Sequence, residues 1–348
     1  MNERFRAMVH ATVFAVLLGW VLHVGRDILV PVVFAILVVY VIIGAARLAA
    51  RLPVVGAKLP VQVHYLLATA LILGALLVLG WVALDSVDRL VAQVPHYRAQ
   101  LVWMVQQGAG LLGIESEPSW QGIRDWVLGQ VSVQALAGST LAWLGAMLAG
   151  FTVVGLYVVF LMLERRHFDA KLGRLSDDPG RVARVRRIIG DINGRIGTYL
   201  ALKTALSVLL GFASWVILAL FGVELAPFWA LVIGLLNYVP YIGSVLGVVL
   251  PVLFAVLQFG DLKTALLLAG ALSVAQFLNG NLLDPYLMGN SLNLSPFVIL
   301  VSLTVWTALW GVPGAFLAVP VTASIVMVLA EFDGSRPLAV LLSRKGEV

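Results

Sequence analysis

Long apolar stretches restrict the fold of this chain more than any single motif. Two of them, Ala226–Phe259 and Pro296–Leu329, extend for 34 residues each. A run of about 18 apolar residues already indicates a transmembrane helix. Charged residues make up only 12% of the 348 residues, whereas a soluble domain carries about 25%. The sequence therefore predicts an all-α, polytopic integral membrane protein that contacts the lipid bilayer.

About eight apolar helical blocks alternate with polar segments. Residues 1–84 contain the first three predicted spans. Residues 85–135 form an extracytoplasmic helical insert in which Leu90, Val94 and Leu101 recur at amphipathic spacing. We expect this insert to pack on the membrane surface or on a neighbouring subunit, and a solvated helical linker is the alternative. The predicted order continues with a fourth span at 136–163, a basic loop at 164–195, a C-terminal core with broken helices at 196–330 and a cytoplasmic tail at 331–348.

The two 34-residue blocks are too long to be ordinary spans. A straight helix of this length would measure about 51 Å, whereas the hydrocarbon core is about 30 Å thick. Both blocks are also interrupted, at Asn237–Gly243 and at Trp310–Gly314. Two re-entrant helical hairpins are the favoured interpretation, and two tilted, kinked helices are the alternative. We expect hinges or helix breaks at the prolines and glycines of this region, which are Pro240, Gly243, Pro285, Gly311, Pro313 and Gly314.

The distribution of basic residues predicts the orientation in the membrane. Nine lysines and arginines lie between Arg165 and Arg195, and most of the others fall on the same side of the predicted spans. Cytoplasmic loops carry an excess of these residues. Both termini and the basic loop are therefore predicted to be cytoplasmic. The positive net charge reflects this orientation, and we expect no nucleic-acid partner.

Polar side chains within the last apolar blocks form two groups, one at the first break and one in the span that follows. At membrane depth such side chains are costly unless they face a cavity or a partner. We interpret Asp284 as the residue for ion or proton coupling, and a loop position in interfacial water is its alternative. The substrate-binding candidates are Asn237, Tyr238, Tyr241, Ser244, Gln276, Asn279 and Asn281. Hydrogen bonding between helices is the alternative for the asparagines.

Signatures of soluble enzymes and of nucleotide-driven pumps are missing from the sequence. It contains no GxxxxGK[ST] phosphate loop, no HExxH zinc motif and no GxSxG elbow. It also has no cysteine for disulfides, thiol chemistry or metal ligation. We therefore expect no enzyme, no cofactor and no metal site. A secondary transporter fits the sequence better than one driven directly by ATP.

Three motifs in the C-terminal core resemble those of a known family. They are Asn237-Tyr-Val-Pro-Tyr-Ile-Gly243, Gln276-Phe-Leu-Asn-Gly-Asn-Leu-Leu-Asp-Pro-Tyr-Leu-Met-Gly289 and Trp310-Gly-x-Pro-Gly-x-x-Leu-Ala-Val-Pro320. Together with the layout of the spans, they resemble the autoinducer-2 exporter family of bacterial permeases. The resemblance covers nearly the whole chain.

This resemblance implies a multi-pass protein of the bacterial inner membrane and a homo-oligomer, with a pentamer as the expected assembly. It also implies export of the quorum-sensing signal autoinducer-2, which is a small polar molecule. Some members of the family are associated instead with sodium/proton exchange. Many members carry a glutamate where this chain has Asn279, and this departure weakens the antiport interpretation.

We expect a small polar solute, similar to autoinducer-2, to bind between the breaks at Asn237–Ser244 and Trp310–Gly314. It would contact Gln276, Asn279 and Asn281, while Asp284 titrates. Two alternatives remain. One is a monovalent cation (Na⁺)/proton antiporter. The other is a non-transporting membrane scaffold that uses the insert and the basic loop to bind partners.

Overall fold

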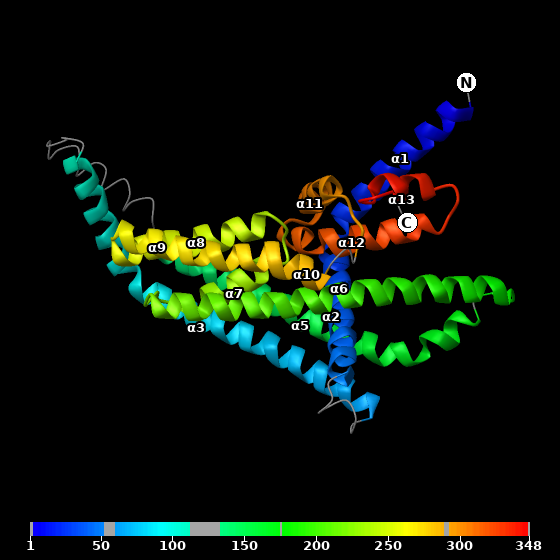
Figure 1. Cartoon of the computed structure of the whole chain (residues 1–348), viewed down its shortest axis with the longest axis horizontal. Helices are drawn as coiled ribbons and strands as arrows, with labels where there is room; N and C mark the ends of the chain where they lie inside the picture. Colours follow the sequence, from blue (N-terminus) through cyan, green and yellow to red (C-terminus); the bar gives the residue numbers. More distant parts are fainter. Residues whose placement is uncertain (1–2, 52–59, 112–132, 175, 289–291, 347–348) are drawn as a thin grey trace. The chain divides into compact units, whose positions relative to one another are not determined.

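A computed structural model describes residues 3–51, 60–111, 133–174, 176–288 and 292–346 (Figure 1). Within these ranges the chain is helical and contains no strand. It forms two compact units. Unit 1 comprises Met1–Leu71, Thr152–Thr204 and Met288–Val348, and unit 2 comprises Ile72–Phe151 and Ala205–Leu287. Each unit is described by itself below.

Three long helices have residues in both units. They are α3 (Val61–Leu111), α5 (Val133–Leu172) and α6 (Pro179–Leu220). The remaining helices of unit 1 are α1 (Glu3–Val24), α2 (Arg26–Arg51), α11 (Pro296–Trp310), α12 (Val312–Ala330) and α13 (Arg336–Leu342). The core beside α11 and α12 is apolar, and Leu294, Val298, Val319 and Ala323 are buried there.

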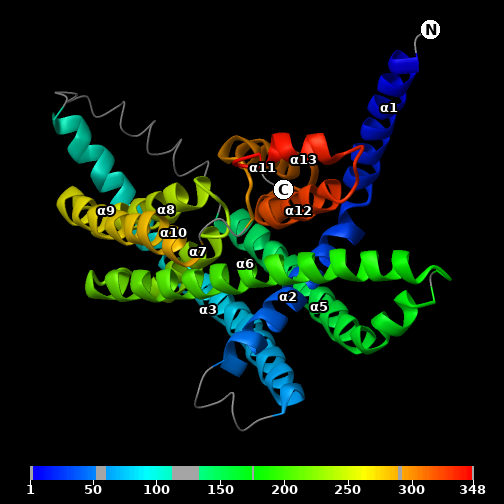
Figure 2. The same cartoon turned by 45° about the vertical axis from the view of Figure 1, so that its right-hand side comes forward.

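Unit 2 contains a run of short helices between residues 226 and 288. They are α7 (Ala226–Leu236), α8 (Ile242–Phe259), α9 (Leu262–Phe277), the π-helix η1 (Leu278–Leu283) and α10 (Asp284–Met288). Figure 2 shows α7, α8 and α9 packed side by side. Their shared core buries Ile233, Phe254, Leu268 and Leu272. In a bilayer, close packing of such side chains holds helices together, because lipid provides no hydrophobic driving force between them.

Membrane-length helices confirm the predicted fold class. Six helical segments in the described residues are long and apolar enough to cross a bilayer. They are Arg26–Ala46, Val63–Ser86, Pro179–Leu220, Ile242–Phe259, Leu262–Met288 and Val312–Ala330. Shorter apolar helices at Thr12–Val24, Ala226–Leu236 and Pro296–Trp310 accompany them. The chain is thus an all-α, polytopic membrane protein.

Both predicted breaks are reversals of chain direction. In the first block, the rings of Trp229 on α7 and Phe254 on α8 lie 5.4 Å apart. In the second, Nε1 of Trp306 on α11 donates a hydrogen bond of 3.0 Å to Oγ1 of Thr322 on α12. These contacts require antiparallel helices and exclude a single kinked helix in each block. We call the two structures the α7–α8 hairpin and the α11–α12 hairpin.

Much of the predicted insert and of the basic loop belongs to long helices that continue from the neighbouring spans. Helix α3 continues without interruption from the third span to Leu111, so the first half of the insert extends that span. The second half, from residue 112 to 132, lies outside the described residues. The basic loop consists mainly of the end of α5 and the start of α6. Asp178 precedes α6, and its Oδ1 accepts a 2.8 Å bond from the Gly180 amide.

Candidate solute-binding site

The tip of the α7–α8 hairpin is a tight turn centred on Tyr241. The Ile242 amide donates to the Pro240 carbonyl at 2.6 Å, which closes a three-residue γ-turn. Tyr241 therefore has φ 61° and ψ −57°, a conformation that is rare for a residue with a side chain. Strain of this kind costs about 1–3 kcal/mol and concentrates at functional sites. The tip is thus a place where the chain tolerates an unfavourable backbone.

Gly243 allows the two helices of this hairpin to approach at the tip. A Cβ atom at this position would lie 1.8 Å from the carbonyl oxygen of Leu236. Because the obstructing atom belongs to the backbone, it cannot rotate away. The predicted hinge role of Gly243 thus has a steric basis in a close approach.

A chain of hydrogen bonds connects the tip to two other helices. Nδ2 of Asn279 donates to Oδ1 of Asn237 at 3.1 Å, and Nδ2 of Asn237 donates to Oγ of Ser207 at 3.0 Å. Asn279 comes from the π-helix, Asn237 from the hairpin tip and Ser207 from α6. Asn279 is only 3% exposed and Ser207 only 5%. We call these three residues the amide chain.

The amide chain is incomplete at Asn279. Among the described residues, Oδ1 of Asn279 is buried and has no hydrogen-bond partner. A buried polar atom without a partner costs about 1–3 kcal/mol. An incoming group that pairs with this oxygen would recover that cost. The unpaired oxygen therefore marks the amide chain as a place where a polar ligand is favoured.

The π-helix places Asn279 in this position. The Asp284 amide donates to the Asn279 carbonyl, five residues earlier, so this turn is wider than an α-helical one. Single π-helical turns are rare and frequent at functional sites. One turn earlier, a Cβ at Gly247 would lie 2.7 Å from Nε2 of Gln276. Gly247 on α8 thus leaves room for the Gln276 side chain beside the amide chain.

The other predicted site residues are not part of the amide chain. Tyr241, Ser244 and Asn281 are exposed, and the last two bond to nearby backbone carbonyls: Oγ of Ser244 donates to Tyr241, and Nδ2 of Asn281 donates to Phe277. Tyr238 and Asp284 are half-buried. The structure therefore brings together Asn237 and Asn279, with Gln276 one helical turn away. It leaves the proton-coupling role of Asp284 as a prediction.

The second predicted break, at Trp310–Gly314, has a different construction and belongs to unit 1. Gly311 has φ 65° and ψ −145°, a conformation that only glycine adopts readily. A Cβ at Gly314 would lie 1.9 Å from the Trp306 carbonyl oxygen. Nε1 of Trp310 donates to the Leu22 carbonyl of α1 at 2.9 Å. Because the two breaks belong to different units, binding of a solute between them stays a prediction.

Sequence reasoning did not identify Ser207 as a site residue. Its signal was present, because Lys203, Ser207 and Ser214 recur along one face of an otherwise apolar span. All three are buried, at 7%, 5% and 1% exposure. Burial of Lys203 argues against the position at the membrane interface that a lysine near the end of a span often takes. The polar face that these three residues form on an otherwise apolar helix would have indicated that the hydroxyl of Ser207 is buried.

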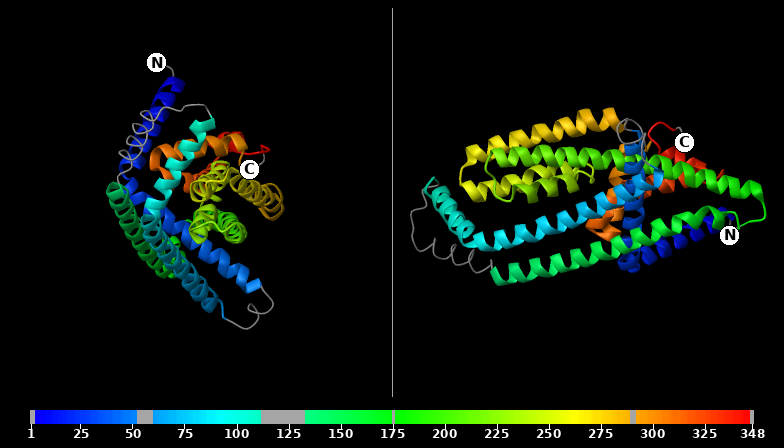
Figure 3. Two further views of the ribbon diagram at one scale, coloured as in Figure 1. Left: turned by 90° about the vertical axis from the view of Figure 1, so that its left-hand side faces the viewer. Right: turned by 90° about the horizontal axis from the view of Figure 1, so that it is seen from below.

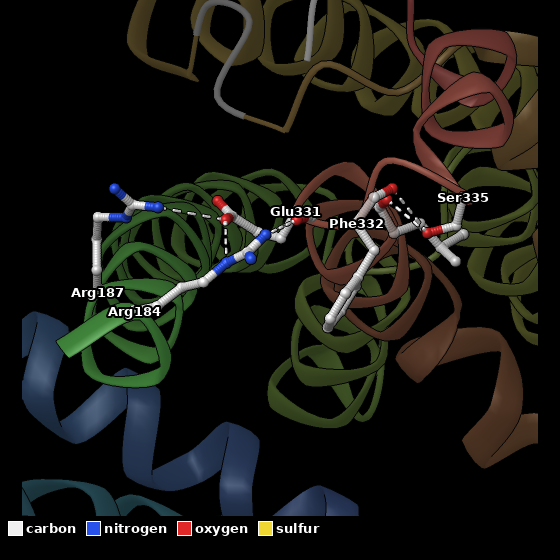
Figure 4. Close-up of polar contacts among 6 residues, drawn as sticks. Arg184, Arg187, Glu331, Phe332 and Ser335 are labelled. Carbon is white, nitrogen blue, oxygen red and sulfur yellow. Dashed lines mark hydrogen bonds and ion pairs between the residues drawn. The ribbon is translucent and has the colours of Figure 1, made fainter. Parts of the chain in front are cut away.

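A second polar cluster lies at the open end of the α11–α12 hairpin (Figure 4). The Glu331 carboxylate lies 3.5 Å from Arg187 and 3.9 Å from Arg184. Arg184 also donates to the Glu331 carbonyl, and its guanidinium lies 5.7 Å from the centre of the Phe332 ring. Both arginine side chains are more than half exposed. This cluster joins α6 to the end of α12 at the surface and differs from the buried amide chain.

Broken apolar helices with buried polar side chains at the break are typical of membrane transporters. Comparison with known proteins agrees with this class. The sequence profile described as "AI-2E family transporter" matches residues 11–333. The chain belongs to this family.

Curated relatives match most of the chain. The AI-2 transport protein TqsA of Escherichia coli K12 is 30% identical over 280 residues, which cover 80% of this chain and 79% of the relative. The candidate transport protein YhhT of the same organism is 29% identical over 336 residues, which cover 95% of this chain and 92% of the relative. The present chain is thus a multi-pass membrane transporter of a bacterial permease family.

Proposed function

We propose that this protein exports a small polar solute similar to autoinducer-2 across the bacterial inner membrane, and that the amide chain binds it. The observation that carries the proposal is the buried, unpaired Oδ1 of Asn279 beside a strained helix break. The relative TqsA is an AI-2 transport protein, which supports the choice of solute. We propose no enzymatic step.

The chemistry of the amide chain favours a neutral, hydroxyl-bearing solute. Ser207, Asn237 and Asn279 carry no charge, so they offer an ion polar atoms but no opposite charge. An amide can present either its oxygen or its nitrogen, and a hydroxyl can donate or accept. A solute hydroxyl therefore pairs with the free end of Asn279 in either amide orientation. Gln276 lies close enough in sequence to add a second contact, and a half-buried Asp284 would couple the movement to a proton.

The proposed orientation follows from the distribution of basic residues, and the proposed assembly is what the family resemblance implies. Both termini and the basic segment at 164–195 face the cytoplasm, and the protein forms a homo-oligomer, with a pentamer expected. Native mass spectrometry in detergent would give the subunit number. Labelling of terminal tags in intact and opened cells would test the orientation.

Transport by proteoliposomes that contain only this protein tests the proposed site. Labelled autoinducer-2 and sodium are supplied separately, each with and without a pH gradient. We expect flux of the signal molecule in the wild type. Asn279→Leu should lose at least about tenfold of this flux, because losing a neutral hydrogen bond to the solute and replacing the amide by an apolar side chain costs about 1.4 kcal/mol or more. Ser207→Ala should show a smaller loss in the same direction.

Thr304→Val is the matched control for removal of a hydroxyl from an apolar helix. Oγ1 of Thr304 donates only to the Leu300 carbonyl of its own helix in the described contacts, and the residue is exposed. Its flux should equal that of the wild type. Flux in Asn279→Leu equal to that in Thr304→Val would remove the amide chain from the proposal. Sodium-coupled proton movement without signal flux would replace the exporter with an antiporter.

A further inference from the structure

The open end of the α7–α8 hairpin is closed by one glutamine. The Glu224 amide, before α7, donates to Oε1 of Gln258 at 2.8 Å. Nε2 of Gln258, near the end of α8, donates to the Gly222 carbonyl at 2.9 Å. The side chain of Gln258 therefore bonds to the segment that leads into α7 through both its oxygen and its nitrogen. These bonds fix the spacing of the two helices at the end opposite the tip.

Helix α3 contributes the third member of this arrangement. Oη of Tyr97 donates to Oε2 of Glu224 at 2.6 Å, a short bond to a carboxylate of the kind that is stronger than a neutral one. The Tyr97 ring also meets Phe254 of α8 edge to face, with centroids 5.4 Å apart. Burial raises the pKa of Tyr97, and the hydrogen bond and negative charge of Glu224 raise it further. The phenol therefore stays protonated and remains a donor at physiological pH.

The same part of α3 lies against the turn between α8 and α9. A Cβ at Gly260 would lie 1.9 Å from Nε2 of Gln100 and 3.1 Å from the Trp103 ring. Gly260 has φ 64°, a backbone conformation that favours glycine. Figure 3 shows the far end of α3, in cyan, beside the yellow turn between α8 and α9. Two turns of α3 thus contact both the segment that leads into α7 and the turn that follows α8.

The hairpin is therefore held by two separate polar groups. The amide chain holds the tip, and Tyr97, Glu224 and Gln258, which we call the clasp, hold the open end. Asn279 is buried, so a solute can reach it only if a neighbouring element moves, and the tip is the element bonded to its side chain through Asn237. A helical hairpin that moves at its tip needs a fixed end, because otherwise the whole element shifts and the tip loses its register with Asn279.

We propose that Tyr97 is a positioning residue for transport, which fixes the open end of the α7–α8 hairpin through Glu224 so that movement is confined to the tip. The inference rests on the proposed function of the amide chain. It assigns a role in transport to the extension of α3 beyond its membrane segment. Tyr97 touches no solute and acts through the hairpin.

Tyr97→Phe is the sharpest test, because it retains the ring against Phe254 and removes only the hydroxyl. We expect the maximal transport rate to decrease at least fivefold, while the solute concentration for half-maximal rate stays within twofold of wild type. Tyr65→Phe is the matched control, because Tyr65 also lies on α3 and its Oη accepts a 3.2 Å bond from Arg165. Unchanged maximal rate in Tyr97→Phe, or an equal change in Tyr65→Phe, would overturn the proposal.

Hydrogen exchange separates failure of this inference from failure of the proposed function. In Tyr97→Phe, the amides of residues 222–226 and 256–260 should exchange at least tenfold faster than in wild type, and those of Tyr65→Phe should not. This result needs no transported solute. If exchange is faster in Tyr97→Phe but the wild type transports no solute, the clasp is retained and the proposed solute is rejected. Unchanged exchange in Tyr97→Phe would reject the clasp even if transport is present.

Discussion

The two hairpins begin from nearly the same sequence plan but differ at their tips. Both start with a Pro-Phe pair, at Pro227 and Pro296. Both place a glycine against a backbone carbonyl, and a Cβ there would lie 1.8 Å away in one case and 1.9 Å in the other. Both turn through a residue with positive φ. The shared plan produces a sharp reversal of an apolar helix.

The residues at the turn differ in chemistry. In the α7–α8 hairpin the residue with positive φ is Tyr241, and the neighbouring Asn237 belongs to the amide chain. In the α11–α12 hairpin the corresponding residue is Gly311, and Trp310 next to it donates to the Leu22 carbonyl. One tip is strained and polar, whereas the other is relaxed and fixed to α1. This difference supports the proposal that the first tip, and not the second, moves during transport.

The open ends of the hairpins differ in a related way. Each has a glutamate, Glu224 just before α7 and Glu331 just after α12. Glu224 accepts from a half-buried tyrosine, whereas Glu331 faces two exposed arginines. A bond shielded from water is stronger than an exposed ion pair. The open end of the α7–α8 hairpin is therefore held more firmly than that of the α11–α12 hairpin.

The largest expected effect is at the glycine that packs against a backbone carbonyl in each hairpin. Gly243→Ala and Gly314→Ala should each lower the free energy of unfolding by about 3 kcal/mol or more, because the new methyl group meets backbone atoms that cannot rotate away. Thermal unfolding in detergent measures this change. Gly270→Ala is the control, since a Cβ there has open space. An unchanged melting temperature in either hairpin variant would show that its tip is less tightly packed than described.

A second pair of substitutions should give opposite signs at the two tips. Tyr241→Gly should raise the free energy of unfolding by about 1 kcal/mol, because it relieves the γ-turn strain and the side chain is 54% exposed. Gly311→Ala should lower it by about 1–3 kcal/mol, because alanine does not adopt that conformation. Chemical denaturation measures both. Transport should decrease in Tyr241→Gly despite the added stability, and destabilisation of this variant would contradict a strained tip.

The smallest expected effect is at Glu331. Glu331→Gln removes the charge that Arg184 and Arg187 face, and exposed ion pairs contribute about 0–1 kcal/mol. We expect a loss of less than about 1 kcal/mol, which shrinks further at high salt because exposed charges are screened. Unfolding at low and high ionic strength measures it. A larger, salt-independent loss of free energy of unfolding would show that the open end of the α11–α12 hairpin is held as strongly as that of the α7–α8 hairpin. The contrast between the hairpins would then be removed.

Much of the fold could be predicted from the sequence because its signals are local. Apolar length predicted the membrane helices, and the prolines and glycines at Pro240, Gly243, Pro313 and Gly314 predicted two reversals. The π-helix was missed, because nothing in its residues distinguishes it from a continued α-helix. The γ-turn was missed because positive φ is unusual for a tyrosine such as Tyr241.

The candidate site was predicted only in part, because its bonds join distant segments. Asn237 and Asn279 were identified as polar residues in an apolar context, although 42 positions separate them. Tyr97 and Glu224 are 127 positions apart, and each looks ordinary in its own segment. Pairs of this kind depend on how the helices pack, which a single sequence does not contain.

The π-helix has a consequence for how this chain could vary in length. Each residue of an α-helix advances the side chain direction by about 100°, and a π-helical turn contains one residue more than an α-helical one. Gly280 lies in this turn with open space around it. Deleting Gly280 would let the turn close as an ordinary helix and would rotate Asp284 and everything after it relative to Asn279. A gain or loss of a single residue here, rather than a substitution, would redirect the side chains of one half of the helix and leave those of the other half in place.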